Sequence, residues 1–344
     1  MNIVLNGFGR IGRILLRNII KHDRFCVKAI NDIDSNTENH AYLFKYDSTH
    51  GKYEGNVQTS GNCIILDQDY TIPFYAQSNI YDLPWDNLNV DLVIDASGVY
   101  QNVLSLNKLV EENLINKAIV THSPKDNVDA TFVMGVNESC YNPAKHNVIS
   151  SSICDVNANS LILNYLNLKF GIESCFITTL HPWLSYQNLL DGSVRSISNP
   201  GHFWQDFALG RASLNNLIPK KTSLVDALVK VIPELSGKIR AFSYRIPTTI
   251  VCSSDLNIIL KKKITKNVIQ NSLNELSDIL PSYISLNSES LTSIDFSGSC
   301  ESVIVDKRWV EVDESNNFLK LILWYDNEWG YCNRVIDLAK HIWS

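Results

Sequence analysis

The sequence predicts an α/β fold in two parts, a doubly wound parallel sheet followed by an α+β domain built on a mostly antiparallel sheet. Three observations carry this prediction. Strand-like and helix-like segments alternate through the first half of the chain, which is typical of a parallel sheet covered by helices. Strand-like segments dominate the second half, which favours antiparallel pairing. The length of 344 residues also exceeds what one small hydrophobic core accommodates, so two domains are expected.

The composition is that of an ordinary globular protein, with 45% apolar and 19% charged residues. A formal net charge of −6 argues against a nucleic-acid partner, because such a partner requires a basic surface. The eight cysteines are scattered, without a CxxC pair or the Cys/His spacing of a zinc site. We therefore expect reduced thiols, no metal and a cytoplasmic location. We also expect no signal peptide and no membrane association, because no apolar run approaches the length of a membrane span.

A glycine-rich turn follows the first expected strand, residues 2–6. Residues 7–12 read G-F-G-R-I-G, and a helical pattern continues from 14 to 20. A G-x-G-x-x-G sequence between a strand and a helix allows a tight turn and the close approach of a pyrophosphate to the helix N-terminus. The sequence therefore predicts a Rossmann-type dinucleotide site. Its expected members are Gly7, Gly9, Arg10, Ile11 and Gly12.

Asn31 and Asp32 end the next expected strand, residues 27–30. Asp32 stands about twenty positions after the last glycine, where a carboxylate accepts hydrogen bonds from the adenosine ribose and repels a 2′-phosphate. NAD is therefore predicted over NADP, and a turn aspartate without a ligand is the alternative interpretation. Ser97 and Ser123 follow later strands. We expect them to line the cofactor groove, because ligands bind at the carboxyl ends of parallel strands.

The spacing of apolar residues predicts the remaining elements. In the first half, strands are expected at 92–95, 117–120, 130–133 and 148–149, with a helix over 104–112. In the second half, strands are expected at 174–180, 239–245, 255–260, 293–296, 302–305 and 318–325, with helices over 268–280 and 327–342. We expect the last helix to pack back on the first domain. The result is an NAD-binding domain of residues 1–153 and 327–344 and a catalytic domain of residues 154–326.

Cys154 is the best candidate for a nucleophile. It stands between the strand at 148–149 and a helical pattern, so it should lie in the first turn of a helix. Unpaired backbone N–H groups and the helix dipole favour a thiolate there, whereas an inert buried cysteine is the alternative interpretation. His181 directly follows the strand at 174–180. It is the natural base for Cys154. A surface or core histidine without a catalytic role is the alternative interpretation.

Several motifs resemble glyceraldehyde-3-phosphate dehydrogenases from end to end. They are N-G-F-G-R-I-G at 6–12, A-I-N-D at 29–32, K-Y-D-S-T-H-G at 45–51, M-G-V-N at 134–137, V-I-P-E-L at 231–235, Y-R-I-P-T at 244–248 and W-Y-D-N-E-W-G-Y at 324–331. Three shorter motifs are more similar to the erythrose-4-phosphate dehydrogenase branch. They are L-P-W at 83–85, H-S-P at 122–124 and G-I-E-S at 171–174.

The resemblance implies an NAD-dependent homotetramer that acts on a small-molecule aldehyde, expected to be a sugar phosphate. Cys154 would attack the aldehyde to give a thiohemiacetal, and His181 would accept its hydroxyl proton while hydride passes to the nicotinamide. Inorganic phosphate then cleaves the resulting thioester in the family reaction. The resemblance assigns Asn327 and Tyr331 to the cofactor. It assigns Thr222, Arg245 and Arg211 to the anion sites.

The chain departs from the family beside the nucleophile. The family usually reads S-C-T-T-N-C where residues 153–158 read I-C-D-V-N-A, so two hydroxyl donors for phosphate are replaced, one of them by Asp155. A carboxylate near phosphate opposes its binding by about 1 kcal/mol in water and several kcal/mol at low dielectric. We also expect Asp155 to raise the pKa of the thiol. The alternative is an outward-turned acid that favours the first helical turn.

The second anion site and the cofactor site differ from the family as well. Leu184 and Tyr186 stand where the family has two threonines, and only Tyr186 can donate a hydrogen bond, from farther out. Ser223 replaces a glycine, and the segment 191–211 is several residues longer than its counterpart. Ser78 stands where an arginine that packs on the adenine is common in the family, which predicts a lower affinity for NAD.

Two functions follow from these patterns. The first is an active NAD-dependent, cysteine-dependent aldehyde dehydrogenase whose acyl-acceptor site has diverged, with erythrose 4-phosphate as a variant substrate and water as a variant acceptor. The second is a paralogue that holds NAD without turnover. Retention of both Cys154 and His181 favours the first. The aldehyde and the acyl acceptor stay open at this point.

Overall fold

In a computed structural model of the chain, the described residues are 1–67, 70–193 and 206–343. Residues 194–205, in the middle of the expected longer segment 191–211, therefore lie outside the described residues. The chain forms two compact units. They are Met1–Ile153 with Tyr331–Ser344, and Cys154–Gly330.

Residues 327–330, which the sequence analysis placed with the first domain, group with the second unit. The carboxylate of Asp326 explains this grouping. Its Oδ1 accepts hydrogen bonds from the backbone N–H groups of Glu328 and Trp329, at 2.9 and 2.7 Å, and its Oδ2 accepts one from Gly298 at 2.7 Å. These bonds tie the turn to a loop of the second unit.

The first unit contains a nine-stranded sheet in the order β10-β11-β9-β8-β1-β2-β7-β6-β5. Its strands are β1 (Asn2–Asn6), β2 (Cys26–Asn31), β5 (Val57–Ser60), β6 (Cys63–Leu66), β7 (Tyr70–Tyr75), β8 (Val90–Asp95), β9 (Ile115–Val120), β10 (Ala130–Thr131) and β11 (Val148–Ser150). From β10 to β7 every neighbouring pair is parallel. Parallel strands that follow β1 in the chain lie on both of its sides, β2 and β7 on one and β8, β9 and β11 on the other, so the predicted doubly wound sheet is confirmed.

Two features of this sheet differ from the prediction. The strands β5, β6 and β7 pair antiparallel at one edge; β5 has only four residues, all half-buried or exposed, which leaves no clear apolar pattern. The strand expected at 130–133 ends at Thr131. It stops early because the side chain of Asn137 accepts a hydrogen bond from the backbone N–H of Val133 at 2.8 Å.

Helices of the first unit are α1 (Arg10–Ile19), α2 (Thr37–Lys45), α3 (Asn102–Glu111) and α7 (Trp329–Trp343), the last of which joins this unit from Tyr331 onward. Short elements are β3 (Tyr46–Asp47), β4 (Gly51–Lys52), and the 3-10 helices η1 (Ile80–Asp82), η2 (Trp85–Asn87) and η3 (Glu138–Cys140). No helix in the described ranges is both long and apolar enough to cross a lipid bilayer.

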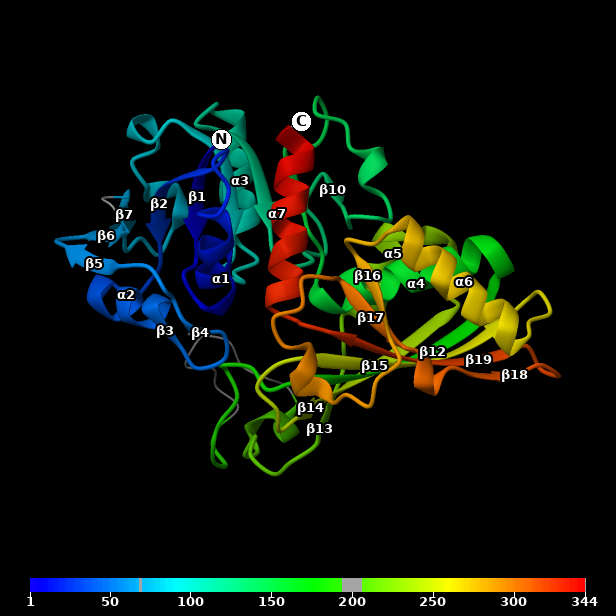
Figure 1. Cartoon of the computed structure of the whole chain (residues 1–344). Coiled ribbons are helices and arrows are strands. Elements are labelled where there is room, and N and C mark those ends of the chain that lie inside the picture. Colours follow the sequence, from blue (N-terminus) through cyan, green and yellow to red (C-terminus); the bar gives the residue numbers. More distant parts are fainter. Residues whose placement is uncertain (68–69, 194–205, 344) are drawn as a thin grey trace. The chain divides into compact units, whose positions relative to one another are not determined.

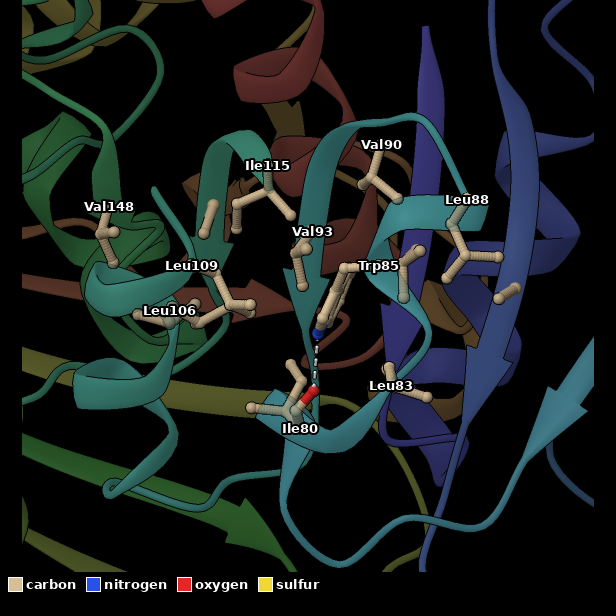
Figure 2. Close-up of a cluster of buried hydrophobic side chains, with 14 of the residues drawn as sticks. Ile80, Leu83, Trp85, Leu88, Val90, Val93, Leu106, Leu109, Ile115 and Val148 are labelled. Atoms are coloured by element: carbon tan, nitrogen blue, oxygen red, sulfur yellow. Dashed lines mark hydrogen bonds between the residues drawn. The ribbon is translucent and has the colours of Figure 1, made fainter. Parts of the chain in front are cut away.

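Trp85 belongs to a buried apolar cluster beside the parallel sheet (Figure 2). Its indole Nε1 donates a hydrogen bond to the backbone carbonyl of Ile80 at 3.1 Å. Leu83, from the same L-P-W motif, lies in this cluster, as do Leu106 and Leu109 of α3. The motif that resembles the erythrose-4-phosphate dehydrogenase branch therefore packs α3 against the sheet, and such core packing carries no information on the substrate.

The second unit contains an eight-stranded sheet in the order β13-β14-β12-β15-β19-β17-β16, with β18 paired to β19. Its strands are β12 (Ile172–Pro182), β13 (Ile218–Lys220), β14 (Ile239–Ile246), β15 (Cys252–Leu260), β16 (Ile284–Asn287), β17 (Val303–Asp306), β18 (Glu311–Asp313) and β19 (Phe318–Tyr325). The pairs β12–β14 and β16–β17 are parallel, and the remaining pairs are antiparallel. The predicted mostly antiparallel sheet is confirmed.

Helices cover one face of the second sheet (Figure 1). They are α4 (Cys154–Phe170), α5 (Leu224–Val231) and α6 (Lys266–Ile279), and the short 3-10 helices are η4 (Phe207–Gly210), η5 (Pro233–Leu235), η6 (Ser293–Phe296) and η7 (Lys307–Trp309). The strand expected at 293–296 is wrong, because these residues form η6. The carboxylate of Asp295 accepts hydrogen bonds from the backbone N–H and the hydroxyl of Thr292, at 2.7 and 3.1 Å, and this cap favours a helical turn.

Candidate active site

The glycine loop of the first unit is shaped by close backbone contacts. Gly7 has a φ of +88°, and an added Cβ there would lie 2.5 Å from the backbone nitrogen of Ser97. An added Cβ at Gly12 would lie 2.0 Å from the carbonyl oxygen of Gly7. Gly9 differs, because an added Cβ would meet nothing within 4 Å. Gly9 directly precedes α1 and is exposed, so the space at this helix N-terminus is open to a ligand.

The carboxylate of Asp32 lies beside this loop, at the end of β2. Its Oδ2 accepts a hydrogen bond from the backbone N–H of Phe8 at 2.6 Å, and its Oδ1 accepts one from Asp34 at 3.2 Å. Asp32 is half-buried, so part of the carboxylate stays accessible to a hydroxyl donor. Arg10 instead pairs with Asp47, at 3.0 Å between Nη1 and Oδ2, and Ile11 is half-buried in the first turn of α1.

A row of buried polar side chains joins three strand ends behind the loop. The amide of Asn31 donates to Oδ1 of Asn6 at 2.7 Å, and the amide of Asn6 donates to Oδ1 of Asp95 at 2.8 Å. Ser97 continues this network, since its backbone N–H donates to Asp95 and its Oγ accepts a hydrogen bond from Asn102 at 3.0 Å. Asn31 and Ser97 therefore fix the strand ends on which the loop rests.

Three further residues predicted to bind the cofactor are Ser123, Tyr331 and Asn327. Ser123 is half-buried after β9. The hydroxyl of Tyr331 lies 2.8 Å from Oγ of Ser151 and donates to the carbonyl oxygen of Ser152 at 3.1 Å, so it ties α7 to the end of β11. Asn327, in the second unit, is 7% exposed and its Oδ1 is buried without a hydrogen-bond partner. Such an orphaned acceptor fits an amide N–H of a ligand.

Cys154 is the first residue of α4, so the expected strand-to-helix position is confirmed. Its Sγ lies 3.9 Å from Nε2 of His181. The other ring nitrogen, Nδ1, lies 2.8 Å from the carbonyl oxygen of Pro182. A carbonyl oxygen only accepts, so Nδ1 carries the hydrogen, and in the neutral ring Nε2 is left with a free lone pair. The lone pair that faces the thiol can therefore take a proton.

The surroundings keep His181 neutral. Burial lowers the pKa of His181 well below its ordinary value, and the positive charges of Arg245 and Lys220 act in the same direction. A histidine with a pKa below 6.5 is uncharged near pH 7 and is ready to act as a base. The electrostatics and the hydrogen bond to Pro182 thus select the form of His181 that Cys154 needs.

Asp155 points inward, so the alternative of an outward-turned acid is wrong. Its side chain is 6% exposed, and its Oδ1 accepts hydrogen bonds from the hydroxyl of Tyr325 at 2.7 Å and from Sγ of Cys154 at 3.7 Å. Burial raises the pKa of the Asp155 carboxyl, against the opposing effects of the Tyr325 hydrogen bond and of the charges of Arg245 and Lys220. The acid is held inside because Tyr325 offers it a donor.

Sheet register brings the partners of Cys154 together. β12 pairs His181 with Arg245 of β14, and β15 pairs Cys252 with Tyr325 of β19. Burial raises the pKa of Cys252 well above its ordinary value, and a hydrogen bond with Cys154 acts in the same direction. Cys252 therefore stays protonated beside the nucleophile.

Sequence reasoning missed three members of this cluster: Lys220, Cys252 and Tyr325. Tyr325 lies in the recognised motif at 324–331. Cys252 stands three residues before the strand expected at 255–260, and the strand begins at Cys252 in the structure. Lys220 ends a strand of three residues, too short for an apolar pattern to reveal.

The predicted anion-site residues fall into two groups. Arg245 is 6% exposed and donates from Nη2 to the hydroxyl of Tyr186 at 3.1 Å, so these two residues share one site. The Oγ1 of Thr222 accepts a hydrogen bond from the backbone N–H of Leu224 at 3.2 Å, at the start of α5. Arg211 forms an exposed ion pair with Asp191 at 3.1 Å. A role for Arg211 in an anion site stays a prediction.

The sulfur, carboxylate and imidazole at the thiol also have the chemistry of metal ligands. One ligand atom each from Cys154, Asp155 and His181 lies within 4.8 Å of the others, and such a donor set suits zinc. Arg245 and Lys220 add two positive charges within electrostatic range of the acid and the imidazole. Their repulsion lowers the affinity of this cluster for a cation.

Comparisons with known proteins agree with the geometry of both units. Residues 1–103 match the family described as "Glyceraldehyde 3-phosphate dehydrogenase, NAD binding domain", and residues 153–327 match its "C-terminal domain". The chain is 36% identical to glyceraldehyde-3-phosphate dehydrogenase 1 of Kluyveromyces lactis over 343 residues, 99% of each chain. It is 36% identical to glyceraldehyde-3-phosphate dehydrogenase of Wickerhamomyces ciferrii over 348 residues, 100% of this chain and 99% of the relative. Identity to glyceraldehyde-3-phosphate dehydrogenase 2 of Saccharomyces cerevisiae is 34% over 343 residues, again 99% of each chain.

Proposed function

The chain belongs to the glyceraldehyde-3-phosphate dehydrogenase family and is an NAD-dependent dehydrogenase of that kind, and on this premise we propose that it oxidises a phosphorylated aldehyde through a thioester on Cys154. The observation that carries the proposal is the distance of 3.9 Å between Sγ of Cys154 and the unprotonated Nε2 of His181. A thiol at the first turn of a helix with a neutral imidazole beside it is the arrangement of an activated nucleophile.

In the proposed reaction the sulfur of Cys154 forms a bond to the carbonyl carbon of the aldehyde. His181 carries the thiol proton to the resulting alkoxide, and it takes this proton back when hydride leaves the carbon. The product is a thioester on Cys154. An oxygen nucleophile then attacks the thioester carbonyl, and the C–S bond breaks to return the thiolate.

The residues of the first unit fit NAD. Bound NAD supplies the hydride acceptor. The open space at Gly9, directly before α1, suits a pyrophosphate, and the accessible part of the Asp32 carboxylate suits a ribose hydroxyl. We assign the orphaned Oδ1 of Asn327 to the carboxamide N–H of the nicotinamide.

We propose further that the acyl-acceptor site has diverged. Asp155 lies inside the site next to the thiol, where its negative charge opposes inorganic phosphate, and Ile153 offers no hydroxyl. Water is the alternative acceptor, with erythrose 4-phosphate as the alternative aldehyde. Water as the acyl acceptor would make the reaction less dependent on inorganic phosphate than the family reaction.

Exposed apolar side chains on one face of the second sheet support self-association, for which we propose a homotetramer. Outward-facing apolar residues on three adjacent strands are Phe176 and Leu180 on β12, Phe242 on β14 and Ile259 on β15, which are 60%, 36%, 44% and 38% exposed. The helices α4, α5 and α6 lie on the opposite face (Figure 1). A cluster of exposed aromatic and aliphatic side chains on a sheet is typical of an interface between subunits.

A panel of aldehydes assayed for NADH formation, with and without inorganic phosphate, tests the proposal. We expect turnover of glyceraldehyde 3-phosphate or erythrose 4-phosphate that changes little when phosphate is removed. A normal phosphate dependence with a rate like that of a housekeeping relative would contradict a diverged acceptor site. No NADH with any aldehyde, together with slow alkylation of Cys154, would instead support the paralogue that holds NAD without turnover.

A further inference from the structure

Lys220 is a half-buried cation on the face of the second sheet that carries His181. The pairing of β13 with β14 places Ile218 opposite Arg245 and Lys220 opposite Ser243. Residues directly opposite in an antiparallel pair share one face, so Lys220 and Arg245 are diagonal neighbours on that face. The parallel pairing of His181 with Arg245 places the imidazole on the same face.

The two cations act on each other and on the groups at the thiol. Burial and then the charge of Arg245 lower the pKa of Lys220 to about 8, whereas the charge of Asp155 raises it. Both cations also lower the pKa of His181 and of the Asp155 carboxyl. Lys220 therefore lies within electrostatic range of His181 and Asp155, two of the residues that contact Sγ of Cys154.

Neither cation has a counter-ion within ion-pair distance among the described residues. Arg245 donates to the neutral hydroxyl of Tyr186, and its Nε is buried without a partner. The Oγ of Ser243, directly opposite Lys220, is also buried without a partner. Arg245 is buried and Lys220 is half-buried. Two like charges this close are unfavourable without an ion pair, and lysine and arginine side chains supply donors only. An anion with several acceptor oxygens would satisfy the donors of Lys220 and Arg245 and balance their charges.

We propose that Lys220 binds substrate, and that together with Arg245 it holds a phosphate dianion next to Cys154. This inference rests on the proposed function, which it deepens. The dianion is either the phosphoryl group of the aldehyde, which agrees with the proposed divergence of the acyl-acceptor site, or inorganic phosphate as acyl acceptor, which would contradict that part of the proposed function. In both cases Lys220 offsets the negative charge of Asp155 and takes the place of the hydroxyl donors that this chain lacks.

Calorimetric titration of the full chain with inorganic phosphate, at constant ionic strength, tests the site without turnover. Lys220→Met removes the charge and keeps the aliphatic stem, and we expect it to raise the Kd for phosphate about 10-fold or more, because a charged hydrogen bond is lost. Lys220→Arg should restore most of the affinity. The matched control is Lys221→Met, which removes an exposed charge one residue away and should leave the Kd unchanged.

Steady-state kinetics of the same variants identify the source of the dianion. If Lys220 holds the aldehyde's phosphoryl group, Lys220→Met lowers the ratio of kcat/KM for glyceraldehyde 3-phosphate to that for glyceraldehyde about 10-fold or more. If it holds the acyl acceptor, the KM for inorganic phosphate rises instead. Equal effects of Lys220→Met and Lys221→Met in calorimetry and in kinetics would overturn the proposal. Absence of NADH formation by the wild type would overturn the proposed function, and calorimetry would still decide the role of Lys220.

Discussion

The glycine loop of the first unit and the Cys154 centre of the second unit are built in different ways. The loop is one continuous stretch, residues 7–12, and the polar side chains behind it are paired with each other, from Asn31 through Asn6 to Asp95. Its demands fall on the backbone, since an added Cβ at Gly12 would lie 2.0 Å from a carbonyl oxygen. The loop therefore depends on its backbone conformation, which residues adjacent in the sequence are enough to specify.

The Cys154 centre combines side chains from one helix and several strands, and its demands are electrostatic. Burial shifts the pKa of His181 downward and that of Asp155 upward, and Nε of Arg245 stays without a partner. Charges that are buried and incompletely paired are typical of functional sites. In this protein, cofactor recognition therefore depends on local chain geometry, whereas the chemistry at Cys154 depends on sheet register.

The largest effect should come from the nucleophile itself. Cys154→Ser should lower kcat at least about 10³-fold, because the hydroxyl is a far weaker nucleophile than the thiolate. The affinity for NAD, measured by calorimetry, should stay within about twofold if the two regions act separately. Cys300→Ser, at an exposed cysteine, is the matched control and should keep full activity. Turnover of the Cys154 variant above a few per cent of wild type would contradict the assignment of Cys154 as the nucleophile.

The second largest effect is expected at His181. His181→Gln should lower kcat/KM about 10²- to 10⁴-fold, because a general base is removed. Its pKa is lowered by burial, so the wild-type profile of kcat/KM should stay flat from pH 8 down to 6.5 and should fall only below that. The unfolded chain binds a proton on this histidine first as the pH falls through 6.5, so the free energy of unfolding should also decrease there. A loss of activity centred at pH 7 or above would contradict a neutral, buried base.

Gly9 and Gly12 separate ligand space from packing within the loop. Gly12→Ala forces a Cβ against the backbone and should lower the free energy of unfolding by about 1–3 kcal/mol or more. An added methyl group at Gly9 meets nothing within 4 Å, so Gly9→Ala should change the free energy of unfolding by less than about 0.5 kcal/mol. It should nevertheless raise the Kd for NAD about 10-fold, because the methyl group fills the space before α1. Thermal unfolding and calorimetry measure the two quantities. Equal NAD affinity of Gly9→Ala and wild type would argue against a pyrophosphate at this position.

The smallest expected effect is a gain in stability at Asp155. Burial raises its pKa, so the folded protein retains a proton that the unfolded chain releases, and stability declines as pH rises through that window. Asp155→Asn keeps an acceptor for Tyr325 and removes the buried charge. It should raise the free energy of unfolding near pH 8 by about 1–3 kcal/mol, with a smaller gain at pH 5.

Denaturant unfolding at the two pH values measures this gain. Asp226→Asn, at an exposed acid in the first turn of α5, serves as the control and should change stability by less than about 0.5 kcal/mol at either pH. A loss of stability in Asp155→Asn at pH 8 would mean that the ionised carboxylate is well compensated. The contrast between a paired loop and an underpaired centre would then be weaker.

Much of the fold followed from local patterns. The strand at 2–6, the glycine turn and the strand at 318–325 matched their expected bounds, because short runs of apolar residues and the needs of glycine act over a few neighbours. The antiparallel edge from β5 to β7 and the 3-10 turn η6 did not follow. Their short segments are stabilised by neighbouring strands and by the Thr292–Asp295 cap, which a local pattern does not display.

By itself the sequence determined the family, the two sheets, the glycine loop and the position of Cys154 at the start of a helix. Only the tertiary structure decided the inward turn of Asp155 toward Tyr325 and the placement of Lys220 beside Arg245. The physical reason is range. Backbone shape depends on adjacent residues, whereas the orientation of a carboxylate and the pKa of a lysine depend on burial and on charges that register brings from distant parts of the chain.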